Sequence, residues 1–72
     1  MPHNDLSSRM REAITLRGIN RKQLALALGV TRSAVDYWMS GERTPDTATL
    51  ERIAIVLGVR PSWLAFGEGE AS

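Results

Sequence analysis

Apolar residues recur at helical spacing along most of the chain, and a glycine follows each of these stretches. The five glycines are Gly18, Gly29, Gly41, Gly58 and Gly67. Glycine suits the end of a helix because it lacks a Cβ atom and adopts a positive φ without steric conflict. No stretch alternates apolar and polar residues with the period of a strand, and β-branched residues do not cluster. The pattern therefore predicts an all-α fold of five short helices.

The first helix is expected over Leu6–Arg17, with Asn4 or Asp5 as its N-cap. A short surface helix buries one apolar stripe and exposes its charged residues. The inner stripe of this helix is predicted to be Leu6, Met10 and Ala13. The charged residues predicted to point outward are Arg9, Arg11, Glu12 and Arg17.

The last two predicted helices follow a loop that contains Pro45. Asp46 is a suitable N-cap for the fourth helix, which should end near Leu57, and Pro61 fits the first position of the fifth. The final residues, GEGEAS, are polar and are expected to fray. We therefore expect one domain over residues 1–67, followed by a polar tail or the start of a linker at 68–72.

The middle of the chain, residues 21–40, predicts two short helices joined by a tight turn. Asn20 precedes the first of them with Gln23 three residues later, which is a capping-box pattern. Gly29 can end that helix, and Thr31 offers an N-cap to the next. A short helix, a glycine turn and a second helix form a helix-turn-helix arrangement.

The second of these two helices separates its residues into two faces. Its apolar face is predicted to carry Ala34, Val35 and Trp38. Its polar face is predicted to carry Ser33, Asp36, Tyr37 and Ser40. One face would pack on the core, and the other would be free to meet a partner.

This twenty-residue stretch resembles the helix-turn-helix of the lambda repressor-like (XRE-type) family, which includes phage Cro and cI repressors and many small bacterial regulators. The seven positions that match the family motif are Leu24, Ala25, Leu28, Gly29, Val30, Val35 and Trp38. The resemblance extends over about residues 6–67. It implies a compact five-helix DNA-binding domain that places its third helix in the major groove of double-stranded DNA and needs no cofactor.

Carried over residue by residue, the resemblance implies base contacts by Arg32, Ser33 and Tyr37, and less clearly by Asp36. Arg32 can bind guanine through two hydrogen bonds, or it can form an ion pair with Asp36 one helical turn away. Ser33 is either a base contact or a small residue that permits close approach. The residues implied to contact phosphates are Arg21, Lys22, Thr31, Arg43, Arg11 and Arg17. Each basic residue in this set has a simpler interpretation as a solvated surface charge.

Two further expectations concern packing and dimerisation. Many relatives have a partly buried Arg–Glu pair where this chain has Ile14 and Met39, and we expect these two apolar side chains to touch instead. The family usually pairs through its fifth helix, for which the candidate interface residues are Val59, Pro61, Trp63 and Phe66. Leu64 is expected to lie in the core. For Trp63, a place in the core and a place at the interface are equally expected. The homodimer would form in solution or only on DNA.

The 72 residues carry a net charge of only +1, but the charge is unevenly distributed. Residues 9–43 hold seven basic and three acidic side chains, a net of +4, whereas residues 44–72 sum to −2. The positive part coincides with the helix-turn-helix, as phosphate binding requires. Without the motif, this mixture would simply indicate a solvated helical surface.

Several other classes of protein find no support in the residues. There is no cysteine, His3 stands alone near the terminus, and no catalytic set, metal site or small-molecule site is evident. The apolar runs are too short to cross a bilayer, which favours a cytoplasmic protein. The family resemblance implies that it is bacterial or phage-encoded and associates with the nucleoid through DNA.

The sequence therefore predicts a non-enzymatic, sequence-specific DNA-binding regulator, and we expect a repressor of phage or prophage type that binds a pseudo-palindromic operator as a dimer. The alternative is an antitoxin-like or other protein-interaction module with the same fold.

Overall fold

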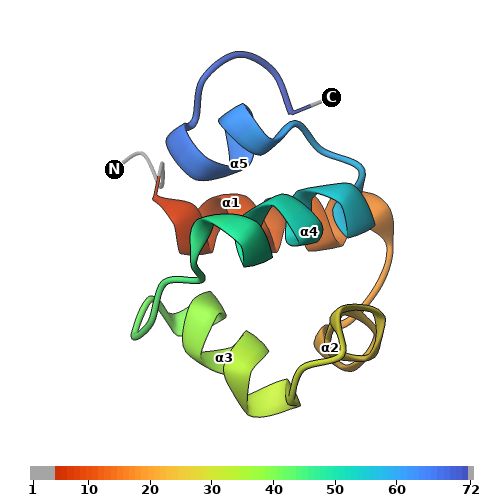
Figure 1. Cartoon of the computed structure of the whole chain (residues 1–72). Helices are drawn as coiled ribbons and strands as arrows, with labels where there is room; N and C mark the ends of the chain where they lie inside the picture. Colours follow the sequence, from red (N-terminus) through yellow and green to blue (C-terminus); the bar gives the residue numbers. More distant parts are fainter. Residues whose placement is uncertain (1–4, 72) are drawn as a thin grey trace.

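The computed structural model describes residues 5–71, and in this part of the chain all regular structure is helical. The five helices are α1 Leu6–Arg17, α2 Arg21–Leu28, α3 Arg32–Ser40, α4 Thr47–Leu57 and α5 Pro61–Phe66. Helices α1 and α4 pack together in the middle of the molecule, with α5 on one side of them and α2 and α3 on the other (Figure 1). The predicted all-α, five-helix fold is confirmed.

Side-chain caps begin four of the five helices. Asp5 accepts a hydrogen bond from the Ser8 N–H at 2.9 Å, and Asp46 accepts one from the Thr49 N–H at 2.8 Å. The capping box of Asn20 is present in full. Asp5 is therefore the cap of α1, and the alternative candidate, Asn4, lies outside the described residues. These caps satisfy N–H groups that have no partner within the helix.

Glycines end every helix in the left-handed conformation, as the sequence predicts. At Gly29, φ is +73°, and no atom outside its neighbours lies within 4 Å of the place where a Cβ atom would be. This glycine is therefore required by the backbone of the turn between α2 and α3 and not by close packing.

The core draws apolar side chains from all five helices. Its fully buried members include Met10, Leu24, Val35, Ile53 and Leu64. Leu64 thus belongs to the core as predicted.

The Ile14 and Met39 side chains are buried in the same apolar cluster, and α1 packs on α3. An apolar pair can replace a buried ion pair because no charge has to be desolvated. Their shared burial agrees with the expected contact, although the direct contact itself stays a prediction.

Arg9 does not point outward, and that prediction is wrong. Only 6% of its surface is exposed. Its Nε atom donates to the Leu64 carbonyl at 2.8 Å, and its Nη2 atom donates to the Ala65 carbonyl at 3.0 Å. Carbonyls in the last turn of a helix lack partners within the helix, so a buried arginine from α1 is a suitable donor for the end of α5. Arg9 lies one turn from Ala13, on the packed side of α1.

The final residues were expected to fray, but the tail is held against the domain as far as residue 71, so that prediction is wrong. The Arg60 N–H donates to the Ala71 carbonyl at 2.7 Å, and the Ala71 side chain packs against the core. Arg60 provides no side-chain cap for α5. The returning tail therefore lies beside the start of α5 (Figure 1).

Candidate nucleic-acid interface

Helix α3 is fixed to the core along one side and open along the other. Its Val35, Trp38 and Met39 side chains are buried. On the opposite side Ser33, Tyr37 and Ser40 are exposed, and Asp36 is half-buried. This is the polar face that the sequence predicts, and it holds three of the four predicted base-contacting residues. The fourth, Arg32, is exposed at the first position of the helix.

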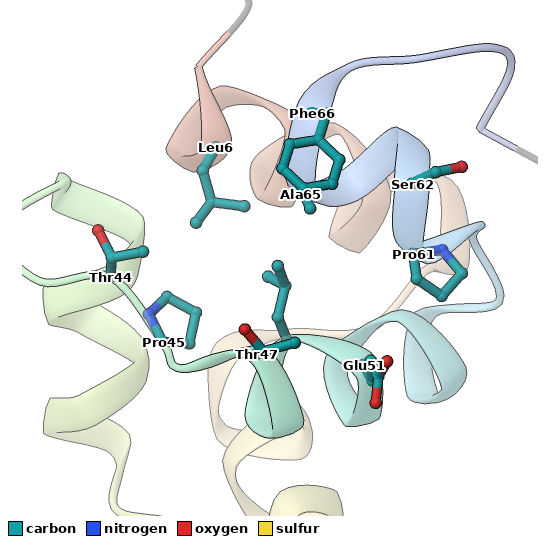
Figure 2. A pocket seen from close by; sticks show the side chains of 10 residues that line it. Leu6, Thr44, Pro45, Thr47, Glu51, Pro61, Ser62, Ala65 and Phe66 are labelled. Atoms are coloured by element: carbon teal, nitrogen blue, oxygen red, sulfur yellow. The ribbon is translucent and has the colours of Figure 1, made fainter.

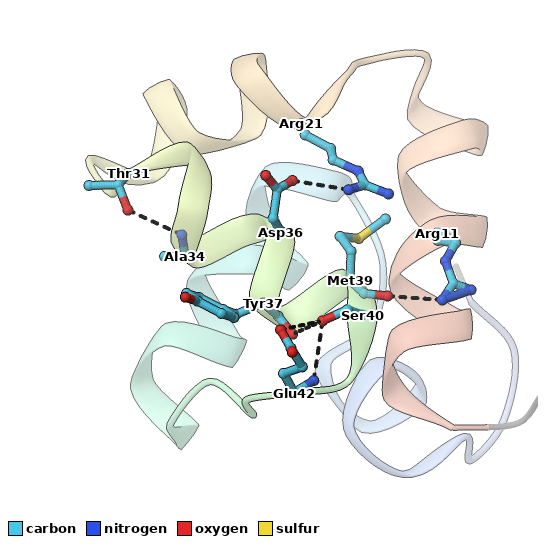
Figure 3. Close-up of polar contacts among 9 residues, drawn as sticks. All are labelled: Arg11, Arg21, Thr31, Ala34, Asp36, Tyr37, Met39, Ser40 and Glu42. Atoms are coloured by element: carbon cyan, nitrogen blue, oxygen red, sulfur yellow. Dashed lines mark hydrogen bonds and ion pairs between the residues drawn. The ribbon is translucent and has the colours of Figure 1, made fainter.

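Asp36 forms its ion pair with Arg21 and not with Arg32. The Arg21 Nη1 atom lies 3.0 Å from Asp36 Oδ1, with 43% and 47% of the two side chains exposed. Figure 3 shows the Arg21 side chain extending from the start of α2 toward α3. The pairing within one helix that the sequence offered as an alternative is therefore replaced by a contact between the two helices. Spacing along α3 could not reveal this contact because it depends on how α2 packs against α3.

An aromatic contact holds Arg43 beside the polar face of α3. Its guanidinium carbon lies 4.3 Å from the centre of the Tyr37 ring, a cation–π distance. The N–H groups of Glu42 and Arg43 both donate to the Tyr37 carbonyl, at 3.0 Å and 3.3 Å. The loop after α3 is thus fixed to the helix, and a predicted phosphate-contacting residue is linked to a predicted base-contacting one.

Two of the other predicted phosphate contacts have structural roles as well. Arg11 donates from Nη2 to the Met39 carbonyl at 2.9 Å, so it ties α1 to the end of α3. Thr31 caps α3, with its hydroxyl oxygen accepting from the Ala34 N–H at 3.1 Å (Figure 3). Arg17 and Lys22 are exposed, on α1 and on α2.

Arg52 on α4 supports the helix-turn-helix, a role that the sequence does not predict. Its Nη2 atom donates to the Leu28 carbonyl at 2.7 Å, so α4 holds the end of α2 beside the turn glycine. Nothing in the periodicity of α4 indicates this role, because Leu28 is 24 residues away.

A shallow hollow of about 390 Å³ lies over the polar face of α3. It is lined by Arg21, Ser33, Asp36, Tyr37, Ser40 and Glu42. Glu42 was not among the predicted site residues. The hollow combines hydroxyl groups with charges of both signs, which suits hydrogen bonding to a polar partner more than binding of an apolar ligand.

A second hollow, of about 440 Å³, lies on the α5 side of the molecule (Figure 2). Its lining residues are Leu6, Thr44, Pro45, Thr47, Leu50, Glu51, Pro61, Ser62, Ala65 and Phe66. Phe66 is 72% exposed there, whereas Trp63 is only 9% exposed and belongs to the core. Of the predicted dimer residues, Pro61 and Phe66 thus remain open to a partner, Val59 is half-buried, and Trp63 has little surface to offer.

Two other features of the described residues bear on the class of protein. None of the helices in residues 5–71 is long and apolar enough to cross a bilayer. In the same residues, no three His, Asp or Glu side chains gather into a group that could hold a metal ion.

Comparison with known proteins gives consistent matches. HTH-type transcriptional regulator PrtR of Pseudomonas aeruginosa is 35% identical over 69 residues, which cover 96% of this chain and 27% of that protein. The HTH-type transcriptional regulator for conjugative element SXT of Vibrio cholerae is 34% identical over 65 residues, 90% of this chain and 30% of that protein. The chain thus spans less than a third of the length of these two relatives.

A third relative is the SPbeta prophage-derived uncharacterized HTH-type transcriptional regulator YonR of Bacillus subtilis. It is 30% identical over 59 residues, 82% of this chain and 55% of that protein. All three relatives are named as transcriptional regulators, which agrees with the prediction of a regulator and not an enzyme. No solved structure matches the chain significantly.

The family model described as helix-turn-helix matches residues 10–64, which include all of α2, α3 and α4. This match covers the capped helix pair, the turn glycine and most of the core. The chain belongs to the Cro/cI-type helix-turn-helix family.

Proposed function

We propose that this domain is a sequence-specific transcriptional regulator that inserts α3 into the major groove of double-stranded DNA. The observation that carries the proposal is the open polar face of α3, because its opposite face is buried and the helix is therefore presented rigidly. Arg32, Ser33 and Tyr37 are its base-reading residues. An arginine on such a face can hydrogen-bond to guanine O6 and N7 together, which distinguishes guanine from the other bases.

Phosphate contacts come from the basic residues that flank this face. Arg21 and Lys22 lie in the first turn of α2, where backbone N–H groups and the helix dipole also favour an anion. Arg43 lies at the other end of α3. Arg11, Arg17 and Thr31 complete the set. Each phosphate neutralised releases counterions, so binding should weaken steeply as salt is raised.

The operator in this proposal is a pseudo-palindrome bound by two copies of the chain. Two recognition helices on a two-fold axis would meet half-sites about 34–36 Å apart, one turn of DNA. Pro61 and Phe66 are the exposed candidates for the contact between copies, on the side of the molecule away from α3 (Figures 1 and 2). Names of relatives that refer to a conjugative element and a prophage support a role as a regulator in a mobile element, and repression is the form of regulation proposed here.

The test is selection of binding sites from a random duplex library at moderate salt. A two-fold symmetric consensus is expected. On the selected site, Arg32→Ala should weaken binding by about 5- to 150-fold for each bound copy, equivalent to about 1–3 kcal/mol, and relax the preference at one base pair of each half-site. Arg21→Ala should weaken binding to the selected site and lower its salt slope by about 1 for each bound copy.

Arg60→Ala is the matched control, because it removes the same charge from the α5 side of the molecule. It should change neither the consensus nor the salt slope. A selection that yields no consensus even at low salt, with either the chain or a covalently tethered dimer, would contradict the proposal and favour the protein-interaction alternative.

A further inference from the structure

The ion pair between Arg21 and Asp36 joins a predicted phosphate-contacting residue to a predicted base-contacting residue. These two positions lie 15 residues apart, on different helices, and their atoms meet at 3.0 Å. Both side chains are about half exposed, at 43% and 47%. Exposed ion pairs of this kind are weak and exchange readily for other partners. Arg21 can therefore leave Asp36 for a phosphate oxygen, provided that the carboxylate gains a partner of its own.

Building on the proposed function, we propose that Arg21 and Asp36 act as one reading unit, in which the base that faces Asp36 decides whether Arg21 reaches the phosphate. An exocyclic amino group, cytosine N4 or adenine N6, replaces Arg21 as the donor to Asp36. Arg21 is then released to the DNA backbone. The ligand of the unit is thus a base that presents an amino group in the major groove.

The chemistry of Asp36 explains why the base controls the exchange. An ionised carboxylate only accepts hydrogen bonds, and close to phosphates it needs a donor to offset repulsion. Cytosine N4 and adenine N6 are donors in the major groove, whereas guanine O6 and thymine O4 are acceptors. Opposite an acceptor, Asp36 keeps Arg21 as its ion-pair partner. The protein then loses one phosphate contact at the wrong base, in addition to the lost base contact.

The geometry around the pair supports a shared site. Arg21, Asp36 and Ser33 line the same hollow over α3, so the base edge and the guanidinium approach the carboxylate from one open space. Figure 3 shows the Asp36 carboxylate and the Arg21 guanidinium facing one another across the gap between α2 and α3. The exchange therefore requires a side-chain rotation of Arg21 and no movement of either helix.

A charge-matched control is available in the same hollow. Glu42 carries the same charge as Asp36, but its carboxylate lies near the Ser40 hydroxyl, at 3.4 Å, and the ion pair of Arg21 is with Asp36. Glu42→Gln removes one negative charge without freeing Arg21. General electrostatic effects of removing an acid can therefore be separated from the specific exchange.

The experiment combines site selection with salt titration for wild type, Asp36→Ala, Asp36→Asn and Glu42→Gln. Wild type should select cytosine or adenine at one position of each half-site. Asp36→Ala should lose that preference, and Asp36→Asn should shift it toward adenine, which an amide binds through N6 and N7. Glu42→Gln should keep the wild-type base. Thermal unfolding followed by circular dichroism should show all variants folded, because the substituted side chains are exposed or half-exposed.

The salt slope gives an independent readout of Arg21. For wild type, the slope on the selected site should exceed that on a site with guanine or thymine at the sensitive position of one half-site by about 0.9, the value for one phosphate contact. In Asp36→Ala the two slopes should be equal, since Arg21 is free on both sites. Arg21→Ala should also equalise the slopes while retaining the base preference of Asp36.

The possible failures are distinguishable. If wild type selects no consensus, the proposed function fails and the reading unit fails with it. If wild type selects a consensus whose bases and slopes are the same in Asp36→Ala, only the reading unit is overturned. If the base preference changes but the wild-type slopes are equal on both sites, Asp36 reads the base without controlling Arg21, and the exchange is refuted.

Discussion

Replacing Arg9 by alanine tests whether one buried cation holds α5 on the rest of the domain. Among the contacts of Arg9 with residues 5–71, the change removes the hydrogen bonds at 2.8 Å and 3.0 Å to the carbonyls of Leu64 and Ala65. Hydrogen bonds that involve a charged group contribute about 1.5–3 kcal/mol each. The gross loss is therefore roughly 3–6 kcal/mol. Part of this is offset, because the variant no longer has to desolvate a guanidinium and water can reach the freed carbonyls.

We expect a net loss of about 3 kcal/mol in the free energy of unfolding for Arg9→Ala. In a domain of this size, each kcal/mol lowers the melting temperature by about 4–8 °C, so the expected shift is about 12–24 °C. Urea unfolding followed by tryptophan fluorescence is a direct assay, because Trp63 lies in α5 and Trp38 in α3. The α5 amides should also exchange with deuterium faster than those of α3.

Arg17→Ala is the control for this experiment, since it removes the same side chain from an exposed position in the last turn of α1. Its favourable interaction with the helix dipole predicts a loss of only about 0.5 kcal/mol. If Arg9→Ala and Arg17→Ala lose the same stability, the two carbonyl contacts do not hold α5, and the reasoning is wrong. Arg9→Met separates the aliphatic stem from the donors, and it should recover only part of the loss.

Three further predictions concern the turn, its support and the caps. Gly29→Ala should cost about 1–2 kcal/mol in urea unfolding, since φ is +73° but no neighbouring atom obstructs a Cβ; a neutral substitution would contradict the left-handed turn. Arg52→Ala should destabilise by about 1.5–3 kcal/mol, because the Leu28 carbonyl loses a charged donor at 2.7 Å, and exchange at the end of α2 should rise more than in α5. Hydrogen bonds from the Ser8 backbone and side chain lower the pKa of Asp5, and those from the Thr49 side chain and backbone lower the pKa of Asp46. Because the folded pKa lies below the unfolded value of about 3.8, the stability from each cap is present above that pH and is lost as pH falls through the folded pKa. Asp46→Asn keeps a capping side chain but removes the titrating carboxylate, so this variant should lose less stability on acidification than wild type. Urea titrations at neutral and acid pH measure that loss. An unchanged acid dependence would show that the Asp46 cap does not contribute to the pH dependence of stability.

Features set by neighbouring residues could be predicted from the sequence. The caps at Asn20, Thr31 and Asp46 depend on residues within one turn, and so does the left-handed glycine after each helix. The two faces of α3 follow from its period alone. For this reason the helix order, the helix boundaries and the polar face of α3 could all be predicted from the sequence.

Features that depend on packing between helices could not be predicted in the same way. Arg9 finds its acceptors 55 and 56 residues further along the chain, and polarity alone had assigned it to the surface. Asp36 had a plausible partner one turn away in Arg32, yet the approach of α2 brings Arg21 to it instead. The tail has no periodic pattern, and its position depends on contacts with residues distant along the chain, among them the hydrogen bond from the Arg60 N–H to the Ala71 carbonyl.

That hydrogen bond also determines where a fused segment can be attached. Because the Ala71 carbonyl is held at 2.7 Å from the Arg60 N–H, residue 71 lies beside the start of α5, across α1 and α4 from the α3 face (Figure 1). A fluorophore or a flexible linker joined after this residue would begin on that side, clear of α3. A single-chain tandem of two domains could therefore be assembled by joining residue 71 of one copy to a second copy through a linker, with the polar face of α3 in the first copy left unobstructed for binding measurements.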